Sequence, residues 1–423
     1  MDPDSTPLAV PRSHPRSAFA PFRYPTFRAI WIANLFSNLG SLIQSVGAAW
    51  LMTELTTSHQ LIAAVQASTT LPIMLLGLFA GAIADNFDRR RVMLAAQVGM
   101  LLISALLAGL SYAGLLGPFA LIALTFAVGA GTALNSPAWQ ASVRQQVPRE
   151  DLPQAITLNS VSFNLARSVG PALGGLLISL WSISAAFAFN AVSYVGMIVV
   201  LARWQPEASQ PARQPMLASI MTGLDFCLHT VPLRKVLLRG LVFGVGAAGY
   251  QSLLPSAARD LLRGSEIDYG LLLGAFGVGS VLTAFTVGRF RTRFGSELTV
   301  CAGTALFALG LSGMAEARSL TMALPSALLG GIGWIATLTS TNVAMQLRSP
   351  EAILGRCLSL YQAVTFGGMA IGAYLWGAVA DAATLPFAMH AAAGWLALSL
   401  LLHFFAPMPA REEGRVDTVE TAR

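Results

Sequence analysis

Charged side chains that could form and break ion pairs are concentrated in one segment, GAIADNFDRRR, between two apolar runs. Two carboxylates, Asp85 and Asp88, precede the basic residues Arg89 and Arg90. Opposite charges at this spacing can pair in one conformation and separate in another, and Gly81 allows two helices to approach closely. We therefore predict a gating loop made of Gly81, Asp85, Asp88, Arg89 and Arg90. The alternative is that the arginines only fix the direction of membrane insertion.

Arg167 is a basic residue in the middle of an apolar run, where burial costs about 2.5 to 3.5 kcal/mol. It shares a helical face with Asn164 and Ser160. This face either contacts water or a substrate or makes structural hydrogen bonds, and the sequence leaves both open. No Asp or Glu lies in the middle of a run. The few candidates for coupling to protons are Glu54, at the end of the first run, Asp381, at the end of the eleventh, and Arg167.

Polar residues also form a stripe in the first apolar run, where Asn34, Asn38 and Ser41 recur at steps of four and three. Lipid does not tolerate such a stripe, so we expect it to line a substrate cavity. Hydrogen bonding to a neighbouring helix is the alternative for each of these residues.

A stripe of small residues follows Arg167 in the segment NLARSVGPALGG. Ala166, Gly170 and Gly174 recur at steps of four, which permits close helix packing, and Pro171 bends the helix. With Gly175 they form a predicted helix-packing motif, for which a purely structural role is the alternative.

Composition excludes most other kinds of protein. The 423 residues are 55% hydrophobic and only 11% charged, against about 25% charged residues in soluble domains. The five histidines form no cluster with acidic residues, which argues against a membrane-embedded enzyme. The three cysteines lack metal-ligand spacing, and no GxxxxGK[ST] loop is present, so we expect no metal, cofactor or nucleotide. Lys and Arg lie in short loops and not on one face, which argues against nucleic acid.

The elements that must position these residues are twelve apolar runs, each long enough to cross a membrane as a helix. We predict an all-α membrane protein with spans near residues 28–52, 61–84, 92–115, 119–142, 154–180, 183–202, 236–258, 269–290, 298–315, 321–346, 357–380 and 384–406.

The distribution of basic residues predicts the orientation. With the N-terminus inside, 22 Lys and Arg residues fall in inner segments and 3 in outer segments, as expected for cytoplasmic loops. Both termini should therefore be cytoplasmic. The predicted domains are an N-terminal tail (1–26), a six-helix bundle (27–202), a linker with a short amphipathic helix (203–234), a second six-helix bundle (235–406) and a C-terminal tail (407–423).

The two halves resemble each other. A shift of 207 residues places Pro25 on Pro232 and Gly81 on Gly288, and a shift of 202 places Gly170 on Gly372. Two similar offsets in the same order along the chain indicate parallel repeats.

The segment that begins at Gly81 resembles the loop signature of the major facilitator superfamily. Asp85, Arg89 and Arg90 match the signature, whereas Asp88 stands where glycine is usual. In the second half, GRFRTRFG carries Thr292 in place of the aspartate, which weakens the latch there. The segment NLARSVGPALGG is similar to part of the antiporter motif of this superfamily, without its upstream glycines.

The resemblance implies a transporter fold in which the first, fourth, seventh and tenth spans surround a cavity. It thereby extends the predicted cavity to Asn135, Gln140, Tyr250, Gln251, Asn342 and Gln346. The pattern is most similar to the bacterial efflux branch, which implies a monomer in the lipid of the inner membrane. The expected function is export of a drug- or siderophore-like molecule, with proton exchange implied by the resemblance and uptake as the alternative.

Overall fold

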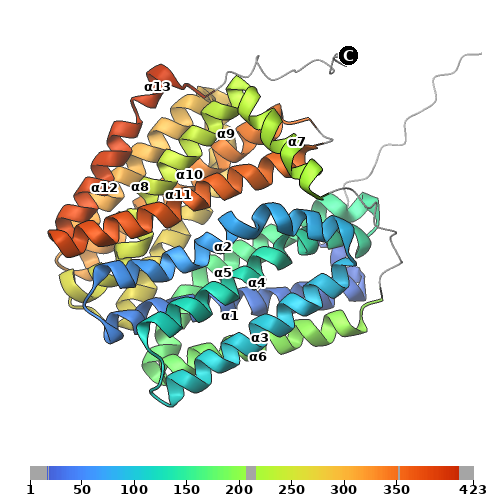
Figure 1. The fold of residues 1–423 in the computed structure, drawn as a ribbon, viewed down its shortest axis with the longest axis horizontal. Helices are drawn as coiled ribbons and strands as arrows, with labels where there is room; N and C mark the ends of the chain where they lie inside the picture. The colour runs from blue at the N-terminus through green and yellow to red at the C-terminus, as the bar shows by residue number, and fades with distance from the viewer. Residues whose placement is uncertain (1–16, 18, 206–215, 351–352, 409–423) are drawn as a thin grey trace, which may run out of the picture.

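The computed structural model describes residues 17, 19–205, 216–350 and 353–408, and this part of the chain is helical without strands (Figure 1). The α-helices are α1 (Pro25–Leu55), α2 (His59–Asn86), α3 (Arg89–Tyr112), α4 (Pro118–Ser142), α5 (Leu152–Leu180), α6 (Ile183–Arg203), α7 (Met216–His229), α8 (Val231–Ser256), α9 (Glu266–Glu316), α10 (Leu320–Arg348), α11 (Leu354–Ala382), α12 (Leu385–Ser399) and α13 (Leu402–Phe405). Short 3-10 turns are η1 (Ala20–Arg23), η2 (Val143–Gln145) and η3 (Arg149–Asp151), and η4 (Ala257–Leu261) is a π-helical turn.

Helix α9 consists of two membrane spans. Its 51 residues would measure about 76 Å as one straight helix, far more than a bilayer requires. The chain reverses at Gly295, whose φ of 85° and ψ of 164° are not helical. A glycine adopts this positive φ without the strain that a Cβ would cause, so the predicted spans 269–290 and 298–315 are the two arms of α9.

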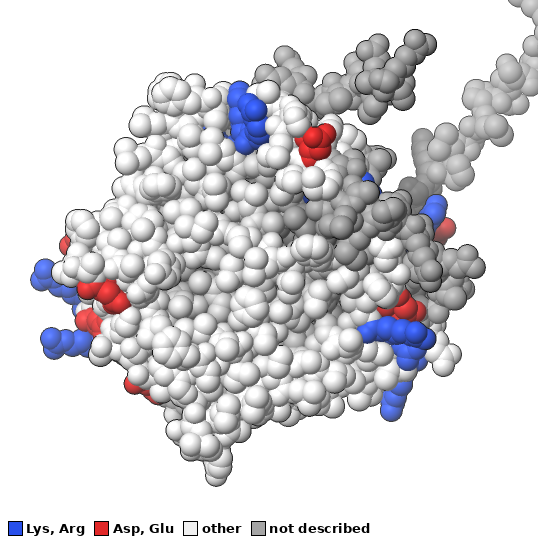
Figure 2. Space-filling view, in the orientation of Figure 1, with Lys and Arg blue, Asp and Glu red and all other residues white. Residues whose placement is uncertain are grey.

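Nine helices of the described residues are long and apolar enough to cross a membrane. Helices α1 and α8, of 31 and 26 residues, also have the length of a span, and with the second arm of α9 they bring the number to twelve. On the face drawn in Figure 2, charged side chains lie towards the edges and an uncharged surface lies between them. The predicted all-α membrane fold is confirmed.

The helices pack in two groups that correspond to the two halves of the chain. In the first group, α1 packs on α5 and α6, and α4 packs on α2 and α3. In the second group, α9 packs on α10 and α12, and α8 packs on α11 and α12. The main contacts between the groups join α2 to α11, which lie side by side in Figure 1, and α5 to α9.

Because successive membrane helices run in opposite directions, the ends of the helices lie at two opposite faces of the molecule. One end carries the starts of α1, α3, α5, α8 and α11 and is named the terminal face, because the described chain ends lie there. The opposite end carries the α1–α2, α8–α9 and α11–α12 connections and is named the distal face.

Candidate functional site

Close contact between the two groups depends on glycines of α5 and α9. A Cβ added at Gly175 of α5 would lie 2.5 Å from the backbone oxygen of Glu266, and one at Gly270 of α9 would lie 2.7 Å from the backbone oxygen of Pro171. Further along the same helices, a Cβ at Gly277 would lie 2.8 Å from the Cα of Ser168. These distances leave no room for a side chain, so the sequence of both helices fixes how closely the groups approach.

The predicted small-residue stripe divides between two neighbours. Gly170 and Gly174 face α1, where an added Cβ would contact Leu42 and Val46 respectively. Ala166 is also buried. By contrast, Pro171 and Gly175 face α9 of the other group. The motif therefore serves packing within one group on one face and contact between groups on another.

Helices α2 and α11 make the second close contact between the groups. A Cβ at Gly377 would lie 2.8 Å from the Cα of Gln60, near the distal face. Deeper in the fold, a Cβ at Gly367 would lie 2.6 Å from the sulfur of Met74. A flexible methionine can move away from such a group, whereas the backbone at Gln60 cannot do so cheaply.

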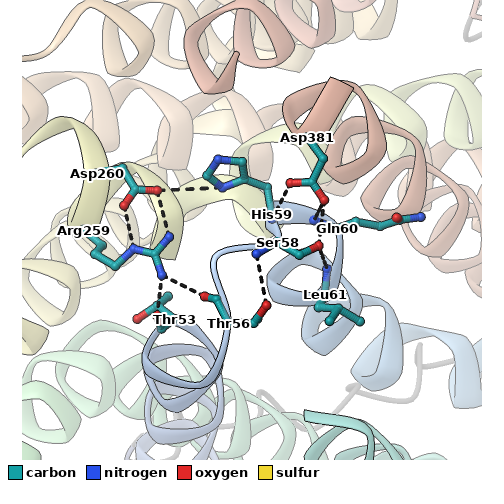
Figure 3. A network of polar contacts seen from close by, with 9 residues as sticks. All are labelled: Thr53, Thr56, Ser58, His59, Gln60, Leu61, Arg259, Asp260 and Asp381. Carbon is teal, nitrogen blue, oxygen red and sulfur yellow. Dashed lines mark hydrogen bonds and ion pairs between the residues drawn. The ribbon is translucent and has the colours of Figure 1, made fainter. Parts of the chain in front are cut away.

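Asp381, at the end of α11, caps the start of α2 from across the boundary between the groups (Figure 3). Its carboxylate accepts hydrogen bonds from the backbone nitrogens of His59 at 2.6 Å and Gln60 at 3.1 Å, and from the Ser58 hydroxyl at 2.6 Å. The first backbone N–H groups of a helix have no partner within the helix, and the helix dipole favours an anion there.

Arg259, in η4, makes the complementary contact at the end of α1 (Figure 3). Its guanidinium donates to the backbone oxygens of Thr53 and Thr56, the latter at 3.0 Å, and pairs with Asp260 at 2.6 Å. A cation is favoured at a helix C-terminus, where carbonyl groups lack partners. The second group therefore supplies one cation and one anion, each matched to the helix end that it contacts in the first group.

On the terminal face, the residues of the predicted gating loop bond within the first group. Asp88 accepts a hydrogen bond from the backbone nitrogen of Arg91 and so caps α3. Arg89 donates to the backbone oxygen of Ala141 in α4, and Arg90 donates to those of residues 201 and 202 in α6. No ion pair joins Asp88 to Arg89 or Arg90, because these three side chains form hydrogen bonds with backbone groups at helix ends instead. The surroundings of Gly81 and the side chain of Asp85 lie outside the part of the chain that is described.

Arg167 reaches from α5 to aromatic residues of the second group. The carbon of its guanidinium lies 5.9 Å from the ring centre of Phe276 in α9 and 5.7 Å from that of Trp334 in α10, within the range of cation–π attraction. Phe276 also stacks on Tyr250 of α8, with ring centres 5.4 Å apart. Arg167 and Tyr250, both predicted to line a cavity, therefore contact the same aromatic cluster.

The other predicted cavity residues of the first group are placed differently from one another. Ser41 shares a hydrogen bond with Tyr194 of α6, which satisfies the hydroxyl within its own group. Asn34 and Asn38 are partly buried, and the exposed side chains of α1 include Phe36, which lies about half a turn away. Sequence reasoning therefore missed the apolar exposed face of α1. A polar stripe is easier to recognise in the sequence than an exposed apolar face, because apolar residues occur on every face of a span.

The remaining cavity predictions fall on α4, α5, α8 and α10. Gln140 and Gln346 are exposed, and Gln346 donates to Asn342 at 2.6 Å. The amide of Asn164 donates to the backbone of its own helix. Two side-chain atoms, the oxygen of Asn135 and the nitrogen of Gln251, are buried without a hydrogen-bond partner, and the oxygen of Gln251 lies 3.5 Å from the nitrogen of Gln66. Glu54 is exposed at the distal end of α1.

One group of side chains in the second half has the composition of a metal site. Glu297, Cys301 and His403 offer ligand atoms within 4.8 Å of one another. However, Oε1 of Glu297, the oxygen that contacts Cys301 and His403, also lies 2.7 Å from the guanidinium of Arg239. The Arg239 side chain is 6% exposed. A buried cation at this distance opposes a metal ion, and the carboxylate also accepts from the backbone of Met408 at 2.5 Å. We assign the cluster to structural hydrogen bonding.

Comparison with known proteins gives the family. Residues 16–421 match the model of the family described as "Transmembrane secretion effector". The enterobactin exporter EntS of Shigella boydii is 27% identical over 393 residues, which cover 88% of this chain and 89% of that protein. The staphyloferrin A transporter of Staphylococcus aureus is 23% identical over 347 residues, which cover 81% and 86% of the two chains.

Solved structures support the same fold. The nucleoside transporter NupG superposes with a TM-score of 0.72 at 13% identity, covering 90% of this chain and 98% of its own. A bacterial homologue of the human lysosomal transporter Spinster, in an inward-facing and unoccupied conformation, gives a TM-score of 0.72 at 14% identity over 94% of this chain and all of its own. The chain therefore belongs to the transmembrane secretion effector family, and it is a multi-pass major facilitator permease related to siderophore exporters.

Proposed function

We propose that this transporter exports a drug- or siderophore-like molecule from the cytoplasm by alternating access. The observation that carries the proposal is the pair of contacts by which Asp381 and Arg259 cap helix ends of the opposite group on the distal face. Contacts of this kind break as a unit when the groups rotate apart. The residues of the terminal-face loop that are described bond within the first group, so rotation does not have to break them.

The terminal face is the cytoplasmic side in this proposal, and the membrane is the bacterial inner membrane. Its support is the excess of Lys and Arg in the segments on that side. The moving bodies are residues 27–202 and 235–406, the protein acts as a monomer surrounded by lipid, and both chain ends are cytoplasmic. Tags at the two ends that reacted on opposite sides of the membrane would contradict this arrangement.

The direction of transport and the coupling ion belong to the proposal as well. Relatives named as enterobactin exporter and staphyloferrin A transporter match along most of the chain and favour a siderophore-like substrate. Because the sequence contains no nucleotide-binding loop, the energy comes from an ion gradient or from a separate partner. We propose proton exchange, with Glu54 and Arg167 as the coupling residues. Export that continues after the proton gradient is collapsed would exclude protons.

The test is the accumulation of dyes and siderophores in cells with and without the protein. Export predicts lower accumulation in cells that contain it, whereas higher accumulation would show uptake. The same measurement with Asp85→Asn and Arg167→Ala tests the gating loop and the cavity. If both variants transport at the wild-type rate, these site assignments are wrong even where export itself is observed.

A further inference from the structure

Arg167 carries a positive charge for which the described residues provide no counter-charge. Its interactions are the two ring contacts with Phe276 and Trp334, and no hydrogen bond or ion pair links its guanidinium to the described part of the chain. Cation–π contacts stabilise a guanidinium only modestly. Arg167 is partly buried, and partial removal of an ionised group from water has a cost that two ring contacts offset only in part.

The neighbouring side chains also have unused hydrogen-bond donors. Trp334, whose ring faces Arg167, has a buried Nε1–H without a partner, and the buried hydroxyl of Tyr250 is likewise unpaired. Tyr250 belongs to the same cluster through its stacking on Phe276. The cluster therefore combines a cation and neutral donors with flat aromatic surfaces, which suits a ligand that brings acceptors and negative charge.

The position of Arg167 favours a ligand over a structural partner. Its side chain comes from the first helix group, whereas both rings come from the second. The close approach of Gly277 to Ser168, next in sequence to Arg167, brings the two groups together at this depth. An anion bound to Arg167 would therefore lie at the boundary that has to open during transport.

We propose that Arg167, held between the first and second helix groups by its contacts with Phe276 and Trp334, binds the anionic group of the transported molecule. The guanidinium presents a planar fork of donors that matches a carboxylate or a similar oxyanion. The rings of Phe276 and Trp334 are 5% and 3% exposed, and they fix the position of the guanidinium from the second group. This inference rests on the proposed transport function and adds that the substrate is an organic anion.

The test uses the purified full chain in lipid nanodiscs and two probes of nearly the same shape, naphthalene-2-carboxylate and its neutral amide. We expect the carboxylate to raise the unfolding temperature by several degrees more than the amide. Arg167→Gln abolishes this preference, and Arg167→Lys retains part of it because charge remains without the fork. Arg318→Gln, at an exposed position on the distal face, is the matched control and keeps the wild-type preference.

The unfolding temperature without ligand separates binding from a structural role. Removal of an unpaired cation leaves Arg167→Gln as stable as the wild type or more stable, whereas loss of a structural contact would lower its unfolding temperature by several degrees. Equal shifts with the two probes, no shift with either, or a carboxylate preference that survives Arg167→Gln would overturn the proposal. These results do not depend on transport, so failure of export in cells and failure of anion binding are distinguished.

Discussion

The carboxylate of Asp381, at the end of α11, lies 2.6 Å from the backbone nitrogen of His59, the first residue of α2. The two residues belong to different helix groups, so this cap exists only while the distal ends of the groups are together. The hydroxyl of Ser58 caps α2 by accepting a hydrogen bond from the backbone nitrogen of Leu61, and it donates a hydrogen bond to Asp381. The capping of α2 at its first residues thereby depends on the relative position of the two halves.

Asp381→Asn is expected to favour opening of the distal face. The amide replaces a charged acceptor by a neutral one, and loss of about 1 kcal/mol changes the population of the open state roughly fivefold. The measurement is labelling of Gln66→Cys by a membrane-impermeant maleimide, in a protein whose Cys227, Cys301 and Cys357 are replaced by serine. Labelling from outside the cell should increase several-fold.

Asp268→Asn is the matched control for this labelling experiment. Asp268 also accepts from a backbone nitrogen at a helix start, that of Ser265 at 2.7 Å, but within the second group alone. Its substitution should leave the labelling of Gln66→Cys at the level of the parent protein. Equal labelling in the Asp381 and Asp268 variants would show that the cap does not hold the groups together.

Gly175→Ala should impair transport by separating α5 from α9. The added methyl group would lie 2.5 Å from the backbone oxygen of Glu266, which cannot move without the helix, and overpacking of this kind costs about 1 to 3 kcal/mol. We expect at least a tenfold loss of transport rate. Gly99→Ala in α3, where an added Cβ contacts nothing within 4 Å, should be neutral or slightly stabilising. Similar rates in both variants would contradict the packing argument.

Arg90→Gln should destabilise the first helix group. The variant loses hydrogen bonds of 2.7 and 2.6 Å to the last carbonyl groups of α6, which correspond to about 1 to 2 kcal/mol of unfolding free energy. Thermal unfolding in nanodiscs measures the effect, with Arg91→Gln at an exposed neighbouring position as the control. An unchanged unfolding temperature for Arg90→Gln would favour a role in conformational change over a role in the stability of this group.

Glu297→Gln should lower the stability of the second group by about 3 kcal/mol or more, because Arg239 then remains buried without its counter-charge. Cys301→Ser should have a small effect, since Cys301 only donates a weak hydrogen bond to the same carboxylate. Addition of Zn²⁺ should not raise the unfolding temperature of the wild type. A rise with Zn²⁺ that disappears in Cys301→Ser would instead identify a metal site.

The sequence by itself determined the helices and the family. Lipid requires every backbone polar group to be bonded within the protein, so an apolar run of sufficient length has to be a helix. The predicted all-α membrane fold is confirmed, and nine helices of the described residues are long and apolar enough to cross a membrane. The loop after Gly81 and the segment around Pro171 were sufficient to indicate the superfamily, because their spacing is local. The roles of the predicted site residues stay predictions.

Only the tertiary structure decided which side chains meet. The hydroxyl of Ser58 and the carboxylate of Asp381 are 323 residues apart, and no local pattern relates an acidic residue at one helix end to the start of another helix. Helical periodicity showed that Ser41 lies on a polar face, but it did not show that this face meets Tyr194. Likewise, the sequence marked Arg167 as costly to bury, whereas its placement between Phe276 and Trp334 required the packing of α5 against α9. Periodicity fixes the face of a helix on which a residue lies, and the identity of the neighbour depends on long-range packing.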